Sequence, residues 1–181
     1  MKSLKSVSVV LLAFVFVLTV ACTRSTKTAD VTDDVRHALD QAGYNDVKAS
    51  DDQVKGVVTL TGAVNSDGDK SRAESIAKAV AGAQVVSNEI GVRPAGDEST
   101  AKKVDADLDS GIDKNLEAML VQHRMSKGVK YDVTNGVVTL KGEVGSQTKR
   151  DSVEKLAQQV PNVKQVVNEL EVKNQKATST K

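Results

Sequence analysis

The sequence predicts an α+β protein of two tandem α-β-β-α-β domains, each a three-stranded sheet with two helices packed on one face. An internal repeat is the first observation behind this prediction. Residues 56–66, GVVTLTGAVNS, return as residues 136–146, GVVTLKGEVGS, an offset of 80 residues. The same offset relates residues 88–90 to residues 168–170. A constant offset over a turn, a strand, a helix and another strand indicates a duplicated domain.

Alternation within the repeated stretch is the second observation. Val58, Leu60 and Val64 fall on one face of this stretch, and Thr59 and Thr61 fall on the other. This period of two is typical of a half-buried strand. Gly62 and its repeat equivalent Gly142 interrupt the apolar face. Glycine inside a strand indicates a bulge or a close backbone approach, and we interpret both as points where a helix crosses the sheet. Asn135-Gly136 is a strong signal for a hairpin turn before the second copy.

The first 21 residues are predicted to be a signal peptide. The apolar run from Val7 to Val20 has 14 residues, which is too short for a comfortable membrane span but suits a signal-peptide core. It ends in Leu-Thr-Val-Ala-Cys at residues 18–22. This ending resembles the lipobox of bacterial lipoproteins, in which a peptidase cuts before the cysteine and the cysteine is acylated.

Cys22 is therefore the expected lipid-attachment residue, and residues 22–29 the lipidated tether. Ordinary secretion and an uncleaved anchor are the alternatives. Several acyl chains would hold the protein on a membrane stably, because each buried methylene contributes roughly 0.8 kcal/mol. Thr23 stands where an aspartate would favour retention at the inner membrane, so the resemblance implies the outer membrane. Cys22 is the only cysteine, which excludes an intramolecular disulfide.

Composition excludes some function classes. Once residues 1–21 are removed, the chain has 23 basic and 24 acidic residues and no Phe or Trp, with Tyr44 and Tyr131 as its only aromatic residues. Aromatic platforms on which bases could stack are nearly absent and the net charge is near zero, so nucleic acid is not an expected partner.

The first domain, residues 30–93, shows the expected order of elements. Asp30 is placed as a helix cap, and Gly43 as the end of that helix. Ser66 and Asp69 form a capping pair for the second helix, which Gly82 ends. The predicted strands cover residues 47–54, 57–64 and 85–92.

The second domain, residues 108–173, repeats this order. Its strands are predicted at residues 129–133, 137–144 and 166–172, with a helix capped by Ser146. Residues 94–107 are either a linker or the start of one helix that runs from Thr100 to about His123. Gly111 inside that helix leaves a break open as the alternative, with Ser110 as a second cap. The tail, residues 174–181, is predicted to be disordered.

The repeated pattern resembles the BON domain, here in tandem. Both copies contain Gly-Val-Val-Thr-Leu-x-Gly-x-Val-x-Ser, then a helix, then Val-x-Asn-x-[Ile/Leu]-x-Val. The resemblance implies the same α-β-β-α-β fold, residence in the bacterial envelope, no enzymatic activity and binding to phospholipid membranes. Tandem members include periplasmic osmotic-shock proteins and outer-membrane lipoproteins that support envelope integrity. No cofactor and no small-molecule substrate are implied.

Competing chemistry has weak support in the residues. His37 and His123 occupy non-equivalent repeat positions without other ligands near them in sequence, and we interpret both as surface residues. The acidic stretch Asn65–Asp69 resembles a cation loop, but a turn with a helix cap explains it better. Asn88 and Asn168 lie on apolar faces, where their amides are expected to bond to backbone at the strand edge. No catalytic residue and no metal site is predicted.

Charge divides the two domains. Residues 30–93 carry seven basic and eleven acidic side chains, a net charge of −4, whereas residues 108–173 carry ten and nine, a net charge of +1. The expected lipid-binding residues of the second domain are Met119, His123, Arg124, Met125, Lys127 and Lys130. The alternatives are an ordinary solvated helix end, and a rival patch of Lys149, Arg150 and Lys155.

Together these observations predict a non-enzymatic, lipid-anchored protein on the periplasmic face of the outer membrane. It would bind anionic phospholipid through its second domain and support envelope integrity. The alternative is an adaptor that contacts envelope proteins, with lipidation as its only membrane contact. An enzyme or a metal carrier has the least support.

Overall fold

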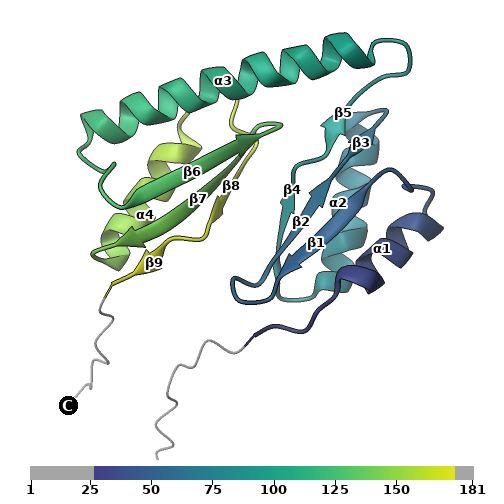
Figure 1. Cartoon of the computed structure of the whole chain (residues 1–181), viewed down its shortest axis with the longest axis horizontal. Coiled ribbons are helices and arrows are strands. Elements are labelled where there is room, and N and C mark those ends of the chain that lie inside the picture. Colours follow the sequence, from purple (N-terminus) through teal and green to yellow (C-terminus); the bar gives the residue numbers. More distant parts are fainter. Residues whose placement is uncertain (1–26, 174–181) are drawn as a thin grey trace, which may run out of the picture.

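The computed structural model describes residues 27–173 and shows two α+β domains side by side (Figure 1). Each domain has a small sheet with two helices, and the sheets approach each other through one edge. Residues 1–21, Cys22 and the tail 174–181, on which several predictions fall, lie outside the described residues.

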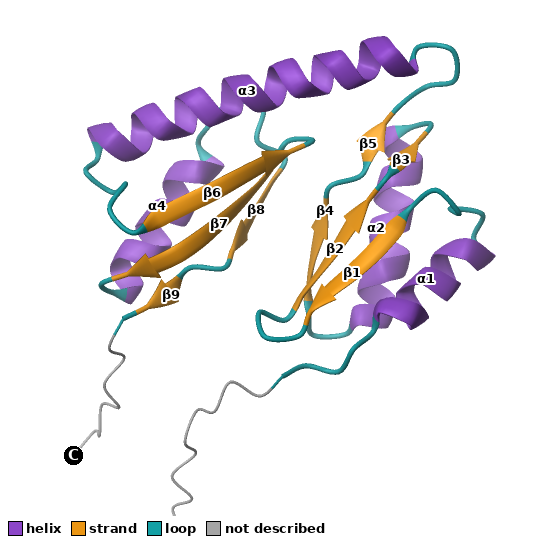
Figure 2. Cartoon of the chain, viewed as in Figure 1, coloured by secondary structure: helices purple, strands orange, loops and turns teal. Residues whose placement is uncertain are grey.

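The first domain follows the predicted order. Its elements are α1 (Thr32–Gln41), β1 (Lys48–Asp52), β2 (Val57–Thr61), β3 (Ala63–Val64), α2 (Asp67–Ala81), β4 (Val85–Asn88) and β5 (Gly91–Val92). Strand β2 lies in the middle, antiparallel to β1 and parallel to β4 (Figure 2). The crossover through α2 joins the two parallel strands, as parallel pairing requires.

The second domain repeats the arrangement and confirms the predicted fold class. Its elements are α3 (Glu98–Gln122), β6 (Val129–Thr134), β7 (Val137–Val144), α4 (Gln147–Gln158), β8 (Gln165–Asn168) and β9 (Glu171–Val172). Strand β7 is antiparallel to β6 and parallel to β8 and β9.

Helix α3 decides between the two alternatives for the domain connection. It runs unbroken for 25 residues, so the long helix is correct and the break at Ser110 is wrong. Ile112, Leu116 and Leu120 are buried in the second domain. Val104 and Leu108 continue the same four-residue spacing but are exposed. Leu108 borders a hollow beside the Asn135-Gly136 turn and lies outside the buried core.

The two central glycines need a correction. No helix crosses the sheet at Gly62 or Gly142. A Cβ added to Gly62 would collide with the backbone carbonyl of Asp46, and one on Gly142 with that of Gly128. The close backbone approach was thus predicted correctly, but its partner is the segment that leads into the first strand of each domain. Both glycines have φ +109°, a conformation that side chains rarely adopt.

The helix caps agree with the sequence in two of three cases. The Ser66 hydroxyl accepts a hydrogen bond from the Asp69 N–H at 3.1 Å, and the Ser146 hydroxyl accepts one from the Lys149 N–H at 3.2 Å. Asp30 is not the cap residue of α1, because Val31 occupies that position. The Asp30 carboxylate instead accepts from the Thr32 N–H at 3.0 Å.

Each domain has a separate core between its sheet and its helices. The first core contains Val35, Leu39, Val58, Leu60, Ala73, Ala77, Val86 and Ile90, and the second contains Ile112, Leu116, Leu120, Val138, Leu140, Val153, Ala157 and Leu170. Strand positions that face these cores alternate with positions on the helix-free face. The helix-free faces therefore remain available for contacts outside the two cores.

Candidate functional site

The predicted lipid-binding residues gather where α3 ends. His123 is the cap residue of α3, and Arg124 follows it with a positive φ of 55°. The Met125 N–H donates to the Leu120 carbonyl at 2.8 Å, which closes the turn and directs the chain toward β6. His123, Arg124 and Lys127 are exposed on this turn.

The two methionines of the predicted site have a structural role. Met119 and Met125 are partly buried and pack against the core of the second domain. The exposed apolar side chain at this end is Val121, which is 60% exposed. The sequence could have indicated the exposure of Val121, because Val121 follows the buried Leu120 and so lies off the apolar face of the helix.

The alternative basic patch of Lys149, Arg150 and Lys155 does not form one surface. The Lys149 ammonium donates to the Lys127 carbonyl at 2.7 Å, so it joins the turn after α3. Arg150 instead points toward β8, where it donates to the Asn168 carbonyl at 3.0 Å. Lys155 is exposed on α4.

Lys130 extends the charged surface onto the sheet. It lies exposed on β6, in register with Lys141 of β7. The basic corner consists of the basic residues at this end of the second domain, which are His123, Arg124, Lys127, Lys130 and Lys149.

Asn88 and Asn168 play equivalent structural roles. The side-chain oxygen of Asn88 accepts from the Ile90 N–H at 3.4 Å, and that of Asn168 accepts from the Leu170 N–H at 3.2 Å. The predicted bond to nearby backbone is thus confirmed. Each side-chain amide also donates to a carboxylate on the neighbouring helix. Asn88 donates to Glu74 at 2.9 Å, and Asn168 donates to Glu154 at 2.7 Å.

A junction between the domains was missed by the sequence analysis. The outer edge of β4 faces β8 (Figure 1). The side-chain oxygen of Gln165 accepts from the Asn88 N–H at 3.0 Å, and its amide nitrogen donates to the Val86 carbonyl at 2.8 Å. The Gln165 amide thus pairs with the edge of β4 as a peptide group of another strand would.

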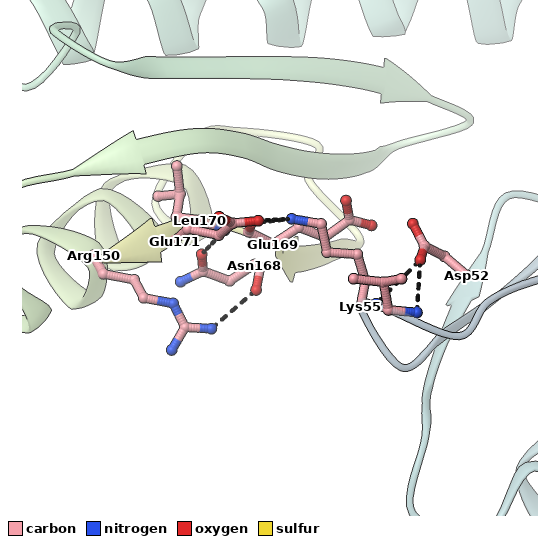
Figure 3. Close-up of polar contacts among 8 residues, drawn as sticks. Asp52, Lys55, Arg150, Asn168, Glu169, Leu170 and Glu171 are labelled. Atoms are coloured by element: carbon pink, nitrogen blue, oxygen red, sulfur yellow. Dashed lines mark hydrogen bonds and ion pairs between the residues drawn. The ribbon is translucent and has the colours of Figure 1, made fainter. Parts of the chain in front are cut away.

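The junction has an approximate two-fold character. Asn135, in the hairpin turn of the second domain, donates to the Glu89 carbonyl at 2.7 Å. Lys55, its repeat equivalent, lies 3.5 Å from the Glu169 carbonyl, which is the equivalent of Glu89 (Figure 3). Equivalent positions of the two domains therefore contact each other, as in an isologous dimer interface.

An apolar seam accompanies these polar contacts. Val57, Val137 and Val167 form a buried cluster separate from the two cores. Val57 and Val137 are repeat equivalents on the helix-free faces. Each of these valines stands on the same strand face as a threonine, Thr59 or Thr139. An apolar residue at that position is the sequence signal that could have indicated this contact.

Two glutamates of the junction have shifted pKa values of opposite sign. The Lys55 ammonium, 2.6 Å from the Glu171 carboxylate, lowers the pKa of Glu171 by hydrogen bonding and by its charge. This pair contributes at neutral pH and is lost as the pH falls through that lowered pKa. Burial raises the pKa of Glu89, with a smaller opposing effect from the Ser87 hydroxyl. The ionised Glu89 thus costs folding free energy at neutral pH, and the cost disappears as the pH falls through the raised pKa.

Three hollows border the junction. A groove of about 480 Å³ lies at Lys55 and Arg150 (Figure 3), and one of about 270 Å³ lies between α2 and β8. A third, of about 410 Å³, lies on the helix-free faces of both sheets. Its lining is polar and comprises Ser50, Thr59, Glu89, Asp132, Thr139, Lys141 and Glu169, with Val133 and Thr134.

The BON domain family model matches residues 27–94 and 105–174 of the chain. The chain belongs to the BON domain family. The two matches coincide with the two structural domains and leave out the first part of α3, which connects them.

Two similar proteins and one solved structure add to this comparison. The chain is 34% identical to "Osmotically-inducible protein Y" of Escherichia coli (strain K12), over 79% of this chain and 71% of that protein. It is 36% identical to an "Uncharacterized protein in gshII 5'region" of Anaplasma centrale, over 67% of this chain and 80% of that protein. The C-terminal domain of CdsD from the type III secretion system of Chlamydia trachomatis aligns with a TM-score of 0.32 at 17% identity, over 80% of this chain and 98% of that one.

Within residues 27–173, no group of three or more His, Cys, Asp or Glu side chains is arranged to hold a metal ion. In the same range, no helix combines the length and hydropathy needed to cross a bilayer. His37 and His123 are both exposed.

We expect Gln165→Ala to weaken the junction between the two BON domains. The substitution leaves the Asn88 N–H and the Val86 carbonyl without their partner, so the free energy of unfolding should fall by about 1–3 kcal/mol. Denaturant unfolding measures this change, and amide hydrogen exchange at Asn88 locates it. Gln158→Ala, at an exposed position of α4, is the control and should change stability by less than about 0.5 kcal/mol. Equal effects of the two substitutions would contradict the assignment.

Proposed function

We propose that this BON protein is a non-enzymatic, lipid-anchored envelope protein that binds anionic phospholipid through its second domain. The basic corner is the observation that carries the proposal. Its lysines and Arg124 form no ion pair with a carboxylate of residues 27–173, so their charge is available to an anionic surface. Each basic residue near such a surface contributes roughly 1 kcal/mol.

The geometry of the basic corner supports contact with a lipid surface. The exposed Val121 lies beside the charged turn and offers an apolar side chain to the headgroup region. Met119 and Met125 support the turn from within the core and are not part of the contact surface in this proposal. Contact through one end of the second domain would keep the net negative charge of the first domain out of the contact surface.

The place of action in this proposal is the periplasmic face of the outer membrane. The lipobox-like residues before Cys22 and the threonine after it support an acyl anchor there. The similarity to the osmotically inducible protein of Escherichia coli supports a role in the envelope, where we propose that this chain helps to maintain integrity.

An adaptor for other envelope proteins is the second candidate function. The polar hollow on the helix-free faces favours it, because Thr59, Thr139 and Lys141 line a concave surface that no helix covers. In that case the acyl chains would be the only contact with the membrane.

Replacement of Arg124, Lys127 and Lys130 by Gln should reduce binding of residues 23–181 to anionic vesicles. The loss of three favourable charges predicts weakening on the order of a hundredfold, with the fold retained. Co-sedimentation with phosphatidylglycerol-rich and with neutral vesicles, at low and at physiological salt, measures the effect.

A variant with Lys102, Lys103 and Lys114 replaced by Gln is the matched control for this experiment. It removes the same charge from exposed positions of α3 and should bind nearly as well as the unmodified chain. Unchanged binding by the first variant would exclude the basic corner and favour the adaptor function. Equal losses in both variants would show an effect of net charge only.

The acyl anchor is tested separately. The full chain, expressed in bacteria supplied with labelled palmitate, should incorporate the label, and Cys22→Ala should abolish incorporation. Retention of the label by the variant would contradict attachment at Cys22.

A further inference from the structure

Two grooves beside the junction occupy equivalent places in the duplicated structure. Lys70 and Asn88 line the one between α2 and β8, and their repeat equivalents Arg150 and Asn168 line the other. Each groove is completed by residues of the opposite BON domain. Both therefore exist only while the domains remain in contact.

The grooves differ in how their charges are balanced. In the one at Arg150, Glu171 pairs with Lys55, and Arg150 itself donates to the Asn168 carbonyl (Figure 3). Gly91 is the repeat equivalent of Glu171 in the first domain. The carboxylate that neutralises one groove therefore has no counterpart in the other.

Three lysines line the groove between α2 and β8, and we call this groove the lysine groove. Lys70 and Lys78 come from α2, and Lys164 comes from the segment before β8. Its one lining carboxylate, Glu74, is already engaged by Lys78 and by the Asn88 amide. Among residues 27–173, neither Lys70 nor Lys164 has a carboxylate within ion-pairing distance.

The two unneutralised lysines influence each other across the domain boundary. Burial lowers the pKa of Lys70, and the charge of Lys164 lowers it further. Asp105, Asp67 and Glu74 act in the opposite direction, yet the pKa of Lys70 stays lowered. An anion placed between the two ammonium groups would relieve this repulsion.

Backbone contacts hold Lys164 in position at the groove. Its N–H donates to the Gly136 carbonyl at 2.8 Å, and its side-chain Cγ and Cδ pass close to Gly136, where a Cβ would be only 3.0 Å away. The stem of the side chain is thus supported by the second domain, and the ammonium group lies at the boundary with the first.

We propose that Lys70 and Lys164 bind a phosphate-bearing anion in the lysine groove, with one ligand from each BON domain. Lysine recognises phosphate as a compact positive charge with three donors. The groove of about 270 Å³ has room for a phosphate ester, which is either a lipid headgroup or a soluble metabolite. The site is distinct from the basic corner and does not depend on the vesicle binding proposed there.

Such a ligand would also stabilise the contact between the domains. It binds the arrangement in which both lysines are present, so it favours that arrangement by mass action. The amide groups of Asn88 and Gln165, which line the same groove, would report its binding.

The test is a titration of the ¹⁵N-labelled full chain, observed through the side-chain amide signals of Asn88 and Gln165. One arm uses inorganic phosphate and glycerol 3-phosphate, and the other uses short-chain phosphatidylglycerol with phosphatidylcholine for comparison. We expect saturable shifts at these two signals and much smaller ones at Asn168 in the equivalent groove. Response to the soluble probes would identify a phosphate-ester site, and response to phosphatidylglycerol alone would identify a headgroup site.

Replacement of both Lys70 and Lys164 by Gln should raise the dissociation constant for the phosphate probe at least about tenfold. The reason is that hydrogen bonds to charged groups contribute more free energy than those between neutral groups. Replacement of the exposed Lys48 and Lys155 by Gln removes the same charge elsewhere and should leave the constant unchanged. The basic-corner variant should lose vesicle binding but keep the shifts of the Asn88 and Gln165 signals. That result would show that the two proposed sites are independent. Non-saturable shifts, or equal effects of both lysine pairs, would overturn the lysine groove as a binding site.

Discussion

Strands β4 and β8 would each expose unpaired backbone groups if the two BON domains stood apart. The Gln165 side chain satisfies two such groups on β4, the Asn88 N–H and the Val86 carbonyl. Exposed strand edges invite unwanted pairing with other chains, so this contact protects the edge as well as joining the domains. The remaining features of the junction, including the buried valines and the grooves on either side, depend on this edge-to-edge approach.

Duplication explains why the contacts at the junction come in related pairs. Lys55 and Asn135 are repeat equivalents, and each lies at the carbonyl of the equivalent glutamate in the other domain. Divergence after duplication has then made the two sides unequal. Glu171 neutralises one groove, and Gly91 stands at the equivalent position of the other. There Lys70 and Lys164 have no carboxylate of residues 27–173 within ion-pairing distance. A nearly symmetric scaffold thus presents two chemically different surfaces.

Local patterns predicted the fold because they depend on neighbours in the sequence. Strand alternation, the caps Ser66 and Ser146, and the repeat itself indicated both domains correctly. The junction could not be predicted in the same way, since Gln165 is an ordinary polar residue until its position opposite β4 is known. The predicted partner of Gly62, a crossing helix, was also wrong. A glycine in a strand indicates that another segment comes close but does not identify that segment. At the basic corner, the sequence indicated the charge but left open whether Met119 packs on the core, as it does.

The central claim is that the two BON domains form one unit with a fixed orientation. Residual dipolar couplings of backbone amides in a weakly aligned sample test it most directly, because they report the orientation of each domain independently of the contacts between them. A single alignment tensor that fits the couplings of both domains is the predicted result. Two tensors of clearly different magnitude or direction would show domains that reorient independently, and would contradict both the junction and the grooves that depend on it.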